Sequence, residues 1–127
     1  MGLFWADHAM AAQESPSAQP RKIILLGARW CAPCIAELRD LPRLVAAAAP
    51  DRIALAWVDR PPALPPALAA QVDIIALPQA HALALRLGGQ GFGLPMAAIM
   101  ASSGQYCRPW PHSLSPERLP DLRQSCD

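Results

Sequence analysis

The sequence predicts an α/β fold in which helices cover both faces of a mixed four-stranded sheet, in the order β-α-β-α-β-β-α. Three apolar runs, at 22–26, 53–58 and 96–100, are short and bounded by turn residues, as buried strands are. Between them lie segments whose apolar residues recur every three or four positions, which is the period of a helix. A chain of 127 residues suits one domain built on such a βαβ unit.

The first strand, 22–26, ends at Gly27, and a single helix is expected from 34 to 49. One side of this helix is apolar and is formed by Ile35, Leu38, Leu41 or Pro42, and Val45. The opposite side is charged and is expected to face solvent, with Glu37, Arg39, Asp40 and Arg43. Pro42 should kink the helix, because proline lacks the backbone N–H that the helix needs.

The second strand, 53–58, leads into a proline-rich connection at 60–66. The next residues, 67–75, fit either a short helix or a helix followed by an extended piece at 72–76. A further helix is expected at 79–87, because Gly88 and Gly89 provide a stop signal.

The C-terminal part is expected to supply two strands and a final helix. The third strand, 96–100, is followed by a turn at 102–104 and by a fourth, antiparallel strand at 105–108, which Pro109 ends. Ser115 is the expected N-cap of a helix that runs to about 125, with Pro116 at its first position and Glu117 in its first turn.

Composition and charge argue against several classes of function. The net charge of +1 indicates neither a nucleic-acid groove nor a polybasic membrane surface. No apolar run reaches the ~20 residues of a membrane span. His8, His81 and His112 are scattered, and the four cysteines do not form the two close pairs of a zinc ribbon. We therefore expect no nucleic-acid partner, no membrane span in this chain and no metal.

The first twenty residues differ in character from the rest, so we divide the chain into a tail at 1–20 and a domain at 21–127. No lysine or arginine precedes Arg21, so the basic start of a secretory signal is absent. The Ala9-Met10-Ala11 triplet nevertheless resembles a signal-peptidase site, and a polar linker follows it. Two interpretations stay open: the remnant of a signal peptide, or a frayed tail with at most one short helix.

The two close cysteines, Cys31 and Cys34, are the strongest functional signal. They follow a strand and begin a helix, whose N-terminus carries a partial positive charge. That charge favours the thiolate of Cys31, the form that attacks disulfides. Cys34 should be the more buried and should resolve the mixed disulfide that Cys31 forms. We expect Trp30 to pack beside the pair and to shield it from water.

The motif Trp30-Cys31-Ala32-Pro33-Cys34 resembles the active-site motif of the thioredoxin superfamily. The resemblance implies a thioredoxin-like fold, Cys31 and Cys34 as catalytic residues, and Trp30, Ala32 and Pro33 as residues that meet the substrate. It also implies that no cofactor is needed besides the redox-active disulfide of the two cysteines.

Gly93-Leu94-Pro95 resembles the cis-proline loop of the same superfamily. The resemblance implies that Pro95 is cis and that the backbone of Leu94 pairs with the substrate chain. Glu37, three residues after Cys34, and the apolar strand after Pro95 are similar to the TlpA/ResA group of bacterial thiol–disulfide reductases. Members of that group face the outside of the cytoplasmic membrane, which implies an extracytoplasmic, periplasmic location; a cytoplasmic reductase is the alternative.

The sequence also departs from the family pattern. Thioredoxins carry a buried acid in the strand before the motif, whereas this strand is apolar around Leu25. The proton acceptor for the resolving cysteine is therefore missing or supplied elsewhere. Arg39 replaces the group's proline five residues past Cys34, and Pro42 could provide the same kink. The segment 60–90 matches no known part of the family.

Cys107 and Cys126 are far apart in the sequence, and two interpretations stay open for them. If the last helix folds back along the last strand, they form a structural disulfide, which would favour an oxidising compartment. Otherwise they are two independent cysteines, because the sequence does not set the distance between them.

The leading functional hypothesis is a monomeric reductase of protein disulfides, since a proline before the second cysteine resembles the reducing members of the superfamily. Its partners would be protein thiol or disulfide substrates and an upstream electron donor. The alternatives are a thioredoxin-fold binding module and a redox-switched assembly factor, for example in cytochrome c maturation or metal delivery, both with little turnover.

Overall fold

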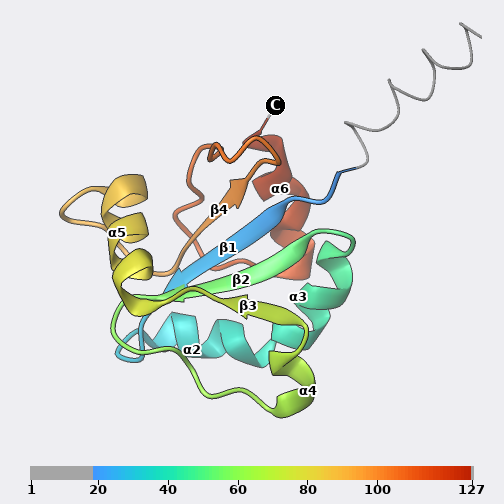
Figure 1. Ribbon diagram of the computed structural model, residues 1–127, viewed down its shortest axis with the longest axis horizontal. Helices are drawn as coiled ribbons and strands as arrows, with labels where there is room; N and C mark the ends of the chain where they lie inside the picture. The colour runs from blue at the N-terminus through green and yellow to red at the C-terminus, as the bar shows by residue number, and fades with distance from the viewer. Residues whose placement is uncertain (1–18, 127) are drawn as a thin grey trace, which may run out of the picture.

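A computed structural model describes residues 19–126, which form a four-stranded sheet between two helical layers (Figure 1). The strand order is β3-β2-β1-β4. The central strand β1 (Lys22–Gly27) pairs in parallel with β2 (Arg52–Trp57) and antiparallel with β4 (Met96–Met100). The short strand β3 (Val72–Ile74) extends the sheet in parallel beyond β2. The predicted mixed four-stranded sheet flanked by helices is confirmed.

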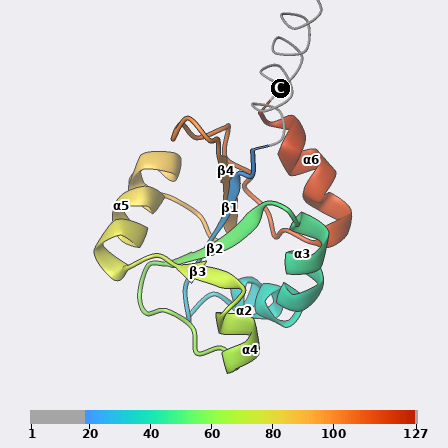
Figure 2. The same ribbon diagram turned by 45° about the vertical axis from the view of Figure 1, so that its right-hand side comes forward.

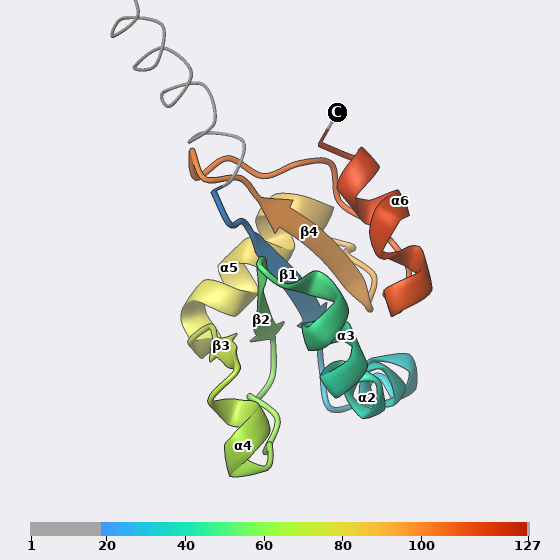
Figure 3. The same ribbon diagram turned by 90° about the vertical axis from the view of Figure 1, so that its right-hand side faces the viewer.

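The helices divide unequally between the two faces of the sheet, as Figures 2 and 3 show. One face is covered by α5 (Leu77–Gly88). The other face is covered by α2 (Ala32–Arg39), α3 (Leu41–Ala48) and α6 (Leu119–Gln124), with the one-turn η1 (Pro116–Arg118) leading into α6. The four-residue helix α4 (Pro66–Ala69) lies in the connection between β2 and β3.

Alternate residues of each strand feed two separate cores, because successive side chains of a strand point to opposite faces. Ile23, Leu25 and Ile99 pack in the cluster that contains α2, α3 and α6. Ile24 and Leu26 pack in the cluster that contains α5. Both faces of the sheet are therefore buried, which explains why these strands are continuously apolar in the sequence.

The fourth strand is not the one that the sequence analysis expected. It is β3, so the alternative of a helix followed by an extended piece is the correct one for 67–75. Residues 105–108 form no strand and meet β4 through the isolated bridge between Met100 and Tyr106, followed by a second bridge between Ala97 and Trp110. Pro109 interrupts this pairing, because proline has no N–H to donate to a ladder.

The predicted single helix at 34–49 is also wrong, since it is two helices separated at Asp40. Pro42 lies in the first turn of α3, where its missing N–H is not needed, and therefore starts a helix instead of kinking one. Leu41 is fully buried and Pro42 is exposed, which settles which of them belongs to the apolar face.

The C-terminal segment returns across the domain and is fixed to α3. Arg123 donates hydrogen bonds from Nη2 to the Ala48 carbonyl at 3.0 Å and to Asp51 Oδ2 at 3.2 Å. The helical segment begins with η1, and Ser115 is its N-cap, with Pro116 and Glu117 in the first turn as predicted, although the Ser115 side chain makes no capping hydrogen bond. On the other face of the sheet, the helix expected at 79–87 is α5, which begins earlier, at Leu77.

The two interpretations of the tail concern residues that lie, apart from 19 and 20, outside the part that the structure describes. Within 19–126, every helix is too short or too polar to cross a bilayer.

Candidate active site

The cysteine pair lies where β1 ends and α2 begins, and the two residues are joined in a disulfide with Cα atoms 5.2 Å apart. Cys31 is the N-cap of α2, and its Sγ accepts a hydrogen bond of 3.2 Å from the backbone N–H of Cys34. Pro33 occupies the first turn, where proline is well tolerated. In the reduced protein this N-terminus would stabilise a thiolate on Cys31.

Gly27 allows the helix to start this close to the sheet. A Cβ atom at this position would lie 2.7 Å from Trp57 Nε1 and 3.2 Å from the Cys34 Cβ. The first distance is shorter than real Cβ contacts, so a larger residue would displace the Trp57 ring or the cysteine helix. Gly27 thus fixes how the ends of β1 and β2 meet α2.

Both cysteines are buried: the exposed fraction is 4% for Cys31 and 1% for Cys34. Cys34 is therefore the more buried, as expected, by a small margin. Trp30 is 70% exposed, so the expectation that it shields the pair from water is wrong. Ala32 and Pro33 are exposed too. Trp30, Ala32 and Pro33 therefore form exposed surface next to the disulfide.

The Leu94–Pro95 loop lies at the same end of the sheet as the cysteine pair. Its peptide bond is cis, and the next residue, Met96, pairs with Leu26 close to the end of β1. Leu94 packs against the core cluster that contains Cys31 and Cys34. The two sequence motifs, at 30–34 and 93–95, are thus brought together by the antiparallel pairing of β1 with β4.

Glu37 contradicts the sequence analysis, which placed it on the solvent side of the helix. Its exposed fraction is 8%, and within 19–126 it is the sole charged residue in the buried class. Its Oε2 accepts a hydrogen bond of 2.7 Å from the Leu114 N–H. Burial raises the pKa of Glu37 to about 7, and the bond from Leu114 opposes that rise. At neutral pH the carboxyl can therefore both take up and release a proton.

A signal for this burial was present in the sequence. Glu37 follows Cys34 by three residues and precedes Leu41 by four, so the three would share one face of the single helix that the sequence predicts. Cys34 and Leu41 are both buried. Helix α2 therefore carries an acid on the same side as Cys34, whereas the strand around Leu25 has none.

Asp59 holds the loops on either side of the site together. Its Oδ2 accepts the Arg29 N–H at 2.9 Å, and its Oδ1 accepts the Arg60 N–H at 2.6 Å. The turn before Cys31 and the start of the proline-rich connection are therefore joined through one carboxylate. The sequence analysis gave no role to Asp59 or Arg60, and neither has a motif that would have revealed one.

The second pair, Cys107 and Cys126, is also a disulfide, with Cα atoms 5.0 Å apart. The sequence left two interpretations open for these cysteines, and the structure confirms the one in which they form a disulfide. It connects the segment that follows β4 to the end of α6, and the closed loop contains Leu114, the partner of Glu37. Within residues 19–126 there is no group of three or more histidine, cysteine or acidic side chains that could hold a metal ion.

Comparison with known proteins supports the fold. A crystal structure of a thiol:disulfide interchange protein, described as a thioredoxin family protein from Chlorobium tepidum TLS, is similar with a TM-score of 0.60. The two are 18% identical in sequence, and the similarity covers 84% of this chain and 79% of that chain. No protein-family model and no curated protein sequence matches this chain. The fold is thus thioredoxin-like.

Proposed function

We propose that this protein is a thiol–disulfide oxidoreductase that reduces protein disulfides through Cys31 and Cys34. The observation that carries the proposal is a disulfide on the first turn of α2, with Cys31 as the N-cap. Reactive cysteines are found at helix N-termini, whereas structural cysteines do not need this position. The likeness to a protein described as a thiol:disulfide interchange protein supports the same chemistry.

In the proposed reaction the Cys31 thiolate attacks one sulfur of the substrate disulfide, and the other substrate sulfur leaves as a thiolate that takes up a proton. The Cys34 thiol then loses its proton and attacks Cys31 Sγ. This breaks the mixed disulfide and releases the second substrate sulfur as a thiol. Two electrons pass to the substrate, Cys31 and Cys34 become a disulfide, and a dithiol donor must reduce them again.

We propose Glu37 as the acceptor of the Cys34 proton. It lies three positions after Cys34 on α2, is buried like Cys34, and accepts a hydrogen bond from Leu114, a residue of the core cluster that contains Cys34. Its pKa of about 7 suits proton exchange at neutral pH. An acid at this helix position is also the feature that resembles the TlpA/ResA group, so we propose membership of that group on this ground.

Trp30, Ala32, Pro33, Leu94 and Pro95 are proposed to bind the substrate. The exposure of the first three and the position of the cis Leu94–Pro95 bond at the same sheet end support this role. An extracytoplasmic location is supported by the Cys107–Cys126 disulfide, since such bonds persist in oxidising compartments.

The first experiment is a titration of the Cys31–Cys34 couple against glutathione or dithiothreitol. A reduction potential close to the roughly −270 mV of thioredoxin is expected for an electron-donating reductase. A potential near the roughly −120 mV of a strong oxidant would overturn the proposed direction of electron flow.

The second candidate function is a binding or assembly factor in which the redox change is incidental. The exposed Trp30 beside the cysteines favours it, because tryptophan is typical of binding hot spots. A Cys31→Ser variant separates the two. If the wild type turns over substrate and the variant does not, the enzyme is supported. If the wild type shows no turnover and the variant still binds the partner fully, the binding protein is supported.

A further inference from the structure

We infer that the surface beside Cys31, formed by Arg29, Arg39 and Arg60 around two apolar hollows, docks an acidic segment of the substrate protein that carries a bulky apolar side chain. This inference rests on the proposed function and names the chemistry of the substrate. We call this surface the arginine face.

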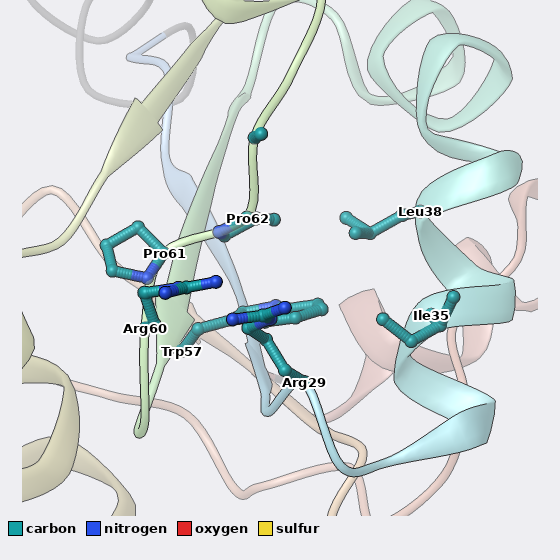
Figure 4. Close-up of a pocket in the computed structure, with 8 residues that line it drawn as sticks. Arg29, Ile35, Leu38, Trp57, Arg60, Pro61 and Pro62 are labelled. Carbon is teal, nitrogen blue, oxygen red and sulfur yellow. The ribbon is translucent and has the colours of Figure 1, made fainter.

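The larger hollow, of about 500 Å³, lies between α2 and the connection that follows β2 (Figure 4). Ile35 and Leu38 point into it from α2, Pro62 faces them from the other side, and Pro61 also contributes to the lining. Trp57 forms part of the lining between these walls. Proline fixes its backbone φ, so the wall opposite α2 is stiff. A hollow of this size with mostly apolar walls can accommodate a large apolar side chain.

A second hollow, of about 420 Å³, adjoins the first and reaches the cysteine motif. The two share Arg29 and Ile35 in their linings. The second is completed by Trp30, Ala32 and Arg39, and Trp30 is 70% exposed. A chain that lies across both hollows would therefore pass directly beside the Cys31–Cys34 disulfide.

The three arginines of this face differ from most other basic residues of the domain. Within residues 19–126, six basic side chains form ion pairs, and none of the six lines either hollow: Arg21, Lys22, Arg43, Arg52, Arg118 and Arg123. In that same part of the molecule, no ion pair involves Arg29, Arg39 or Arg60.

Asp59, which adjoins this face, forms no ion pair with its guanidinium groups. Asp59 uses its two oxygens on the backbone N–H groups of Arg29 and Arg60. It therefore holds the two arginine backbones in place and leaves their side chains available. The linings of the two hollows contain these three arginines and no acidic residue, so the face carries a positive charge, which attracts an acidic partner. Arginine and tryptophan are also the residue types that dominate binding hot spots.

The test uses two synthetic peptides, each with a phenylalanine beside a disulfide-bonded cysteine, flanked by glutamates in one and by lysines in the other. The readout is the ratio of second-order rate constants for reduction by the dithiol protein. The wild type is expected to prefer the acidic peptide about tenfold at low salt, and added NaCl should shrink this preference. Replacing phenylalanine by glycine in the acidic peptide should slow its reduction.

An Arg39→Glu/Arg60→Glu variant should abolish or reverse the preference for the acidic peptide. The matched control is Arg108→Glu, which changes an exposed arginine outside both hollows and should keep the wild-type ratio. Thermal unfolding of each oxidised variant checks that the domain still folds. Equal rates for both peptides with the wild type, or an unchanged ratio in the double variant, would overturn the inference.

Uncharged hydroxyethyl disulfide separates this failure from failure of the proposed function. If the wild type reduces hydroxyethyl disulfide but shows no peptide preference, the docking inference alone is wrong. If the wild type reduces neither hydroxyethyl disulfide nor the peptides, the proposed function is wrong and the docking inference falls with it.

Discussion

The two disulfides of this protein occupy opposite kinds of surroundings. Cys31 and Cys34 are three positions apart, and their bond lies on a helix N-terminus with a buried carboxyl on the same helix face. Cys107 and Cys126 are nineteen positions apart, and their bond closes the C-terminal segment onto the domain. The same covalent bond is thus suited to electron transfer in one region and to cross-linking in the other. The difference lies in the neighbours of the sulfur atoms and in the length of chain enclosed.

The largest expected effect is the loss of activity caused by the Cys31→Ser substitution. Cys31→Ser should lower the rate of disulfide reduction more than about a thousandfold, because it removes the attacking sulfur. The Cys107→Ser/Cys126→Ser variant should retain the wild-type rate. Reduction of insulin with dithiothreitol as donor measures both. Comparable losses in the two variants would mean that the second disulfide takes part in the reaction.

The next effect is on stability and should be specific to the second disulfide. Its removal should lower the free energy of unfolding by about 3 kcal/mol, because a long loop loses its closure constraint. Urea unfolding of the double serine variant, with Cys31 and Cys34 oxidised, gives this value. The short loop of the first disulfide should contribute less, so an equal loss on its reduction would contradict the comparison.

Glu37 provides a third, pH-dependent test. Its pKa is about 7 in the folded protein and 4.5 in the unfolded chain, so the folded protein binds more protons between these values. This group therefore makes the domain less stable as pH rises from 4.5 through 7. The expected loss is about 2 kcal/mol between pH 5 and pH 8. Glu37→Gln should remove this loss and unfold at higher urea than the wild type at pH 8.

The comparison of Glu37→Gln with the wild type isolates this group, since all other titrating side chains are shared. Glutamine keeps an oxygen for the Leu114 N–H, whereas Glu37→Ala does not and serves as the control for that bond. If the wild type and Glu37→Gln show the same pH dependence of unfolding, the carboxyl does not titrate in this range.

The smallest effect on stability is expected for Trp30. The side chain is 70% exposed, so Trp30→Ala should change the free energy of unfolding by less than about 0.5 kcal/mol. The same substitution should slow the reduction of the acidic peptide described above, because Trp30 lines the hollow beside the cysteines. A large loss of stability would instead show that this tryptophan packs on the domain.

The sequence predicted three of the strands and the cysteine motif correctly, because each depends on residues that are close together in the chain. The strands 22–26, 53–58 and 96–100 were found from their continuous apolar character, because both faces of the sheet are covered. The cysteine motif was found from residue types at fixed spacing. The break at Asp40 was missed because proline was interpreted as a kink, although it also suits the first turn of a new helix.

The remaining features depend on contacts between distant segments. Only the tertiary structure shows that 72–74 rather than 105–108 supplies the fourth strand, because both segments are short and weakly patterned. The arginine face joins a turn before α2 to a connection after β2, and no periodicity relates the two. The spacing of Glu37 from Cys34 is visible in the sequence, but its partner Leu114 is supplied by the C-terminal segment, whose return over α2 no local pattern predicts.

The bond between Glu37 and Leu114 spans 77 positions of the chain, and this separation has a consequence for synthesis. A growing chain presents Cys31, Cys34 and Glu37 well before Leu114 has been added. Until then the carboxyl lacks both its backbone donor and the covering segment, and it is an ordinary solvated acid. The cysteine pair therefore exists as a chemical group early in translation, but it acquires its buried acid only when the last part of the protein has folded over it.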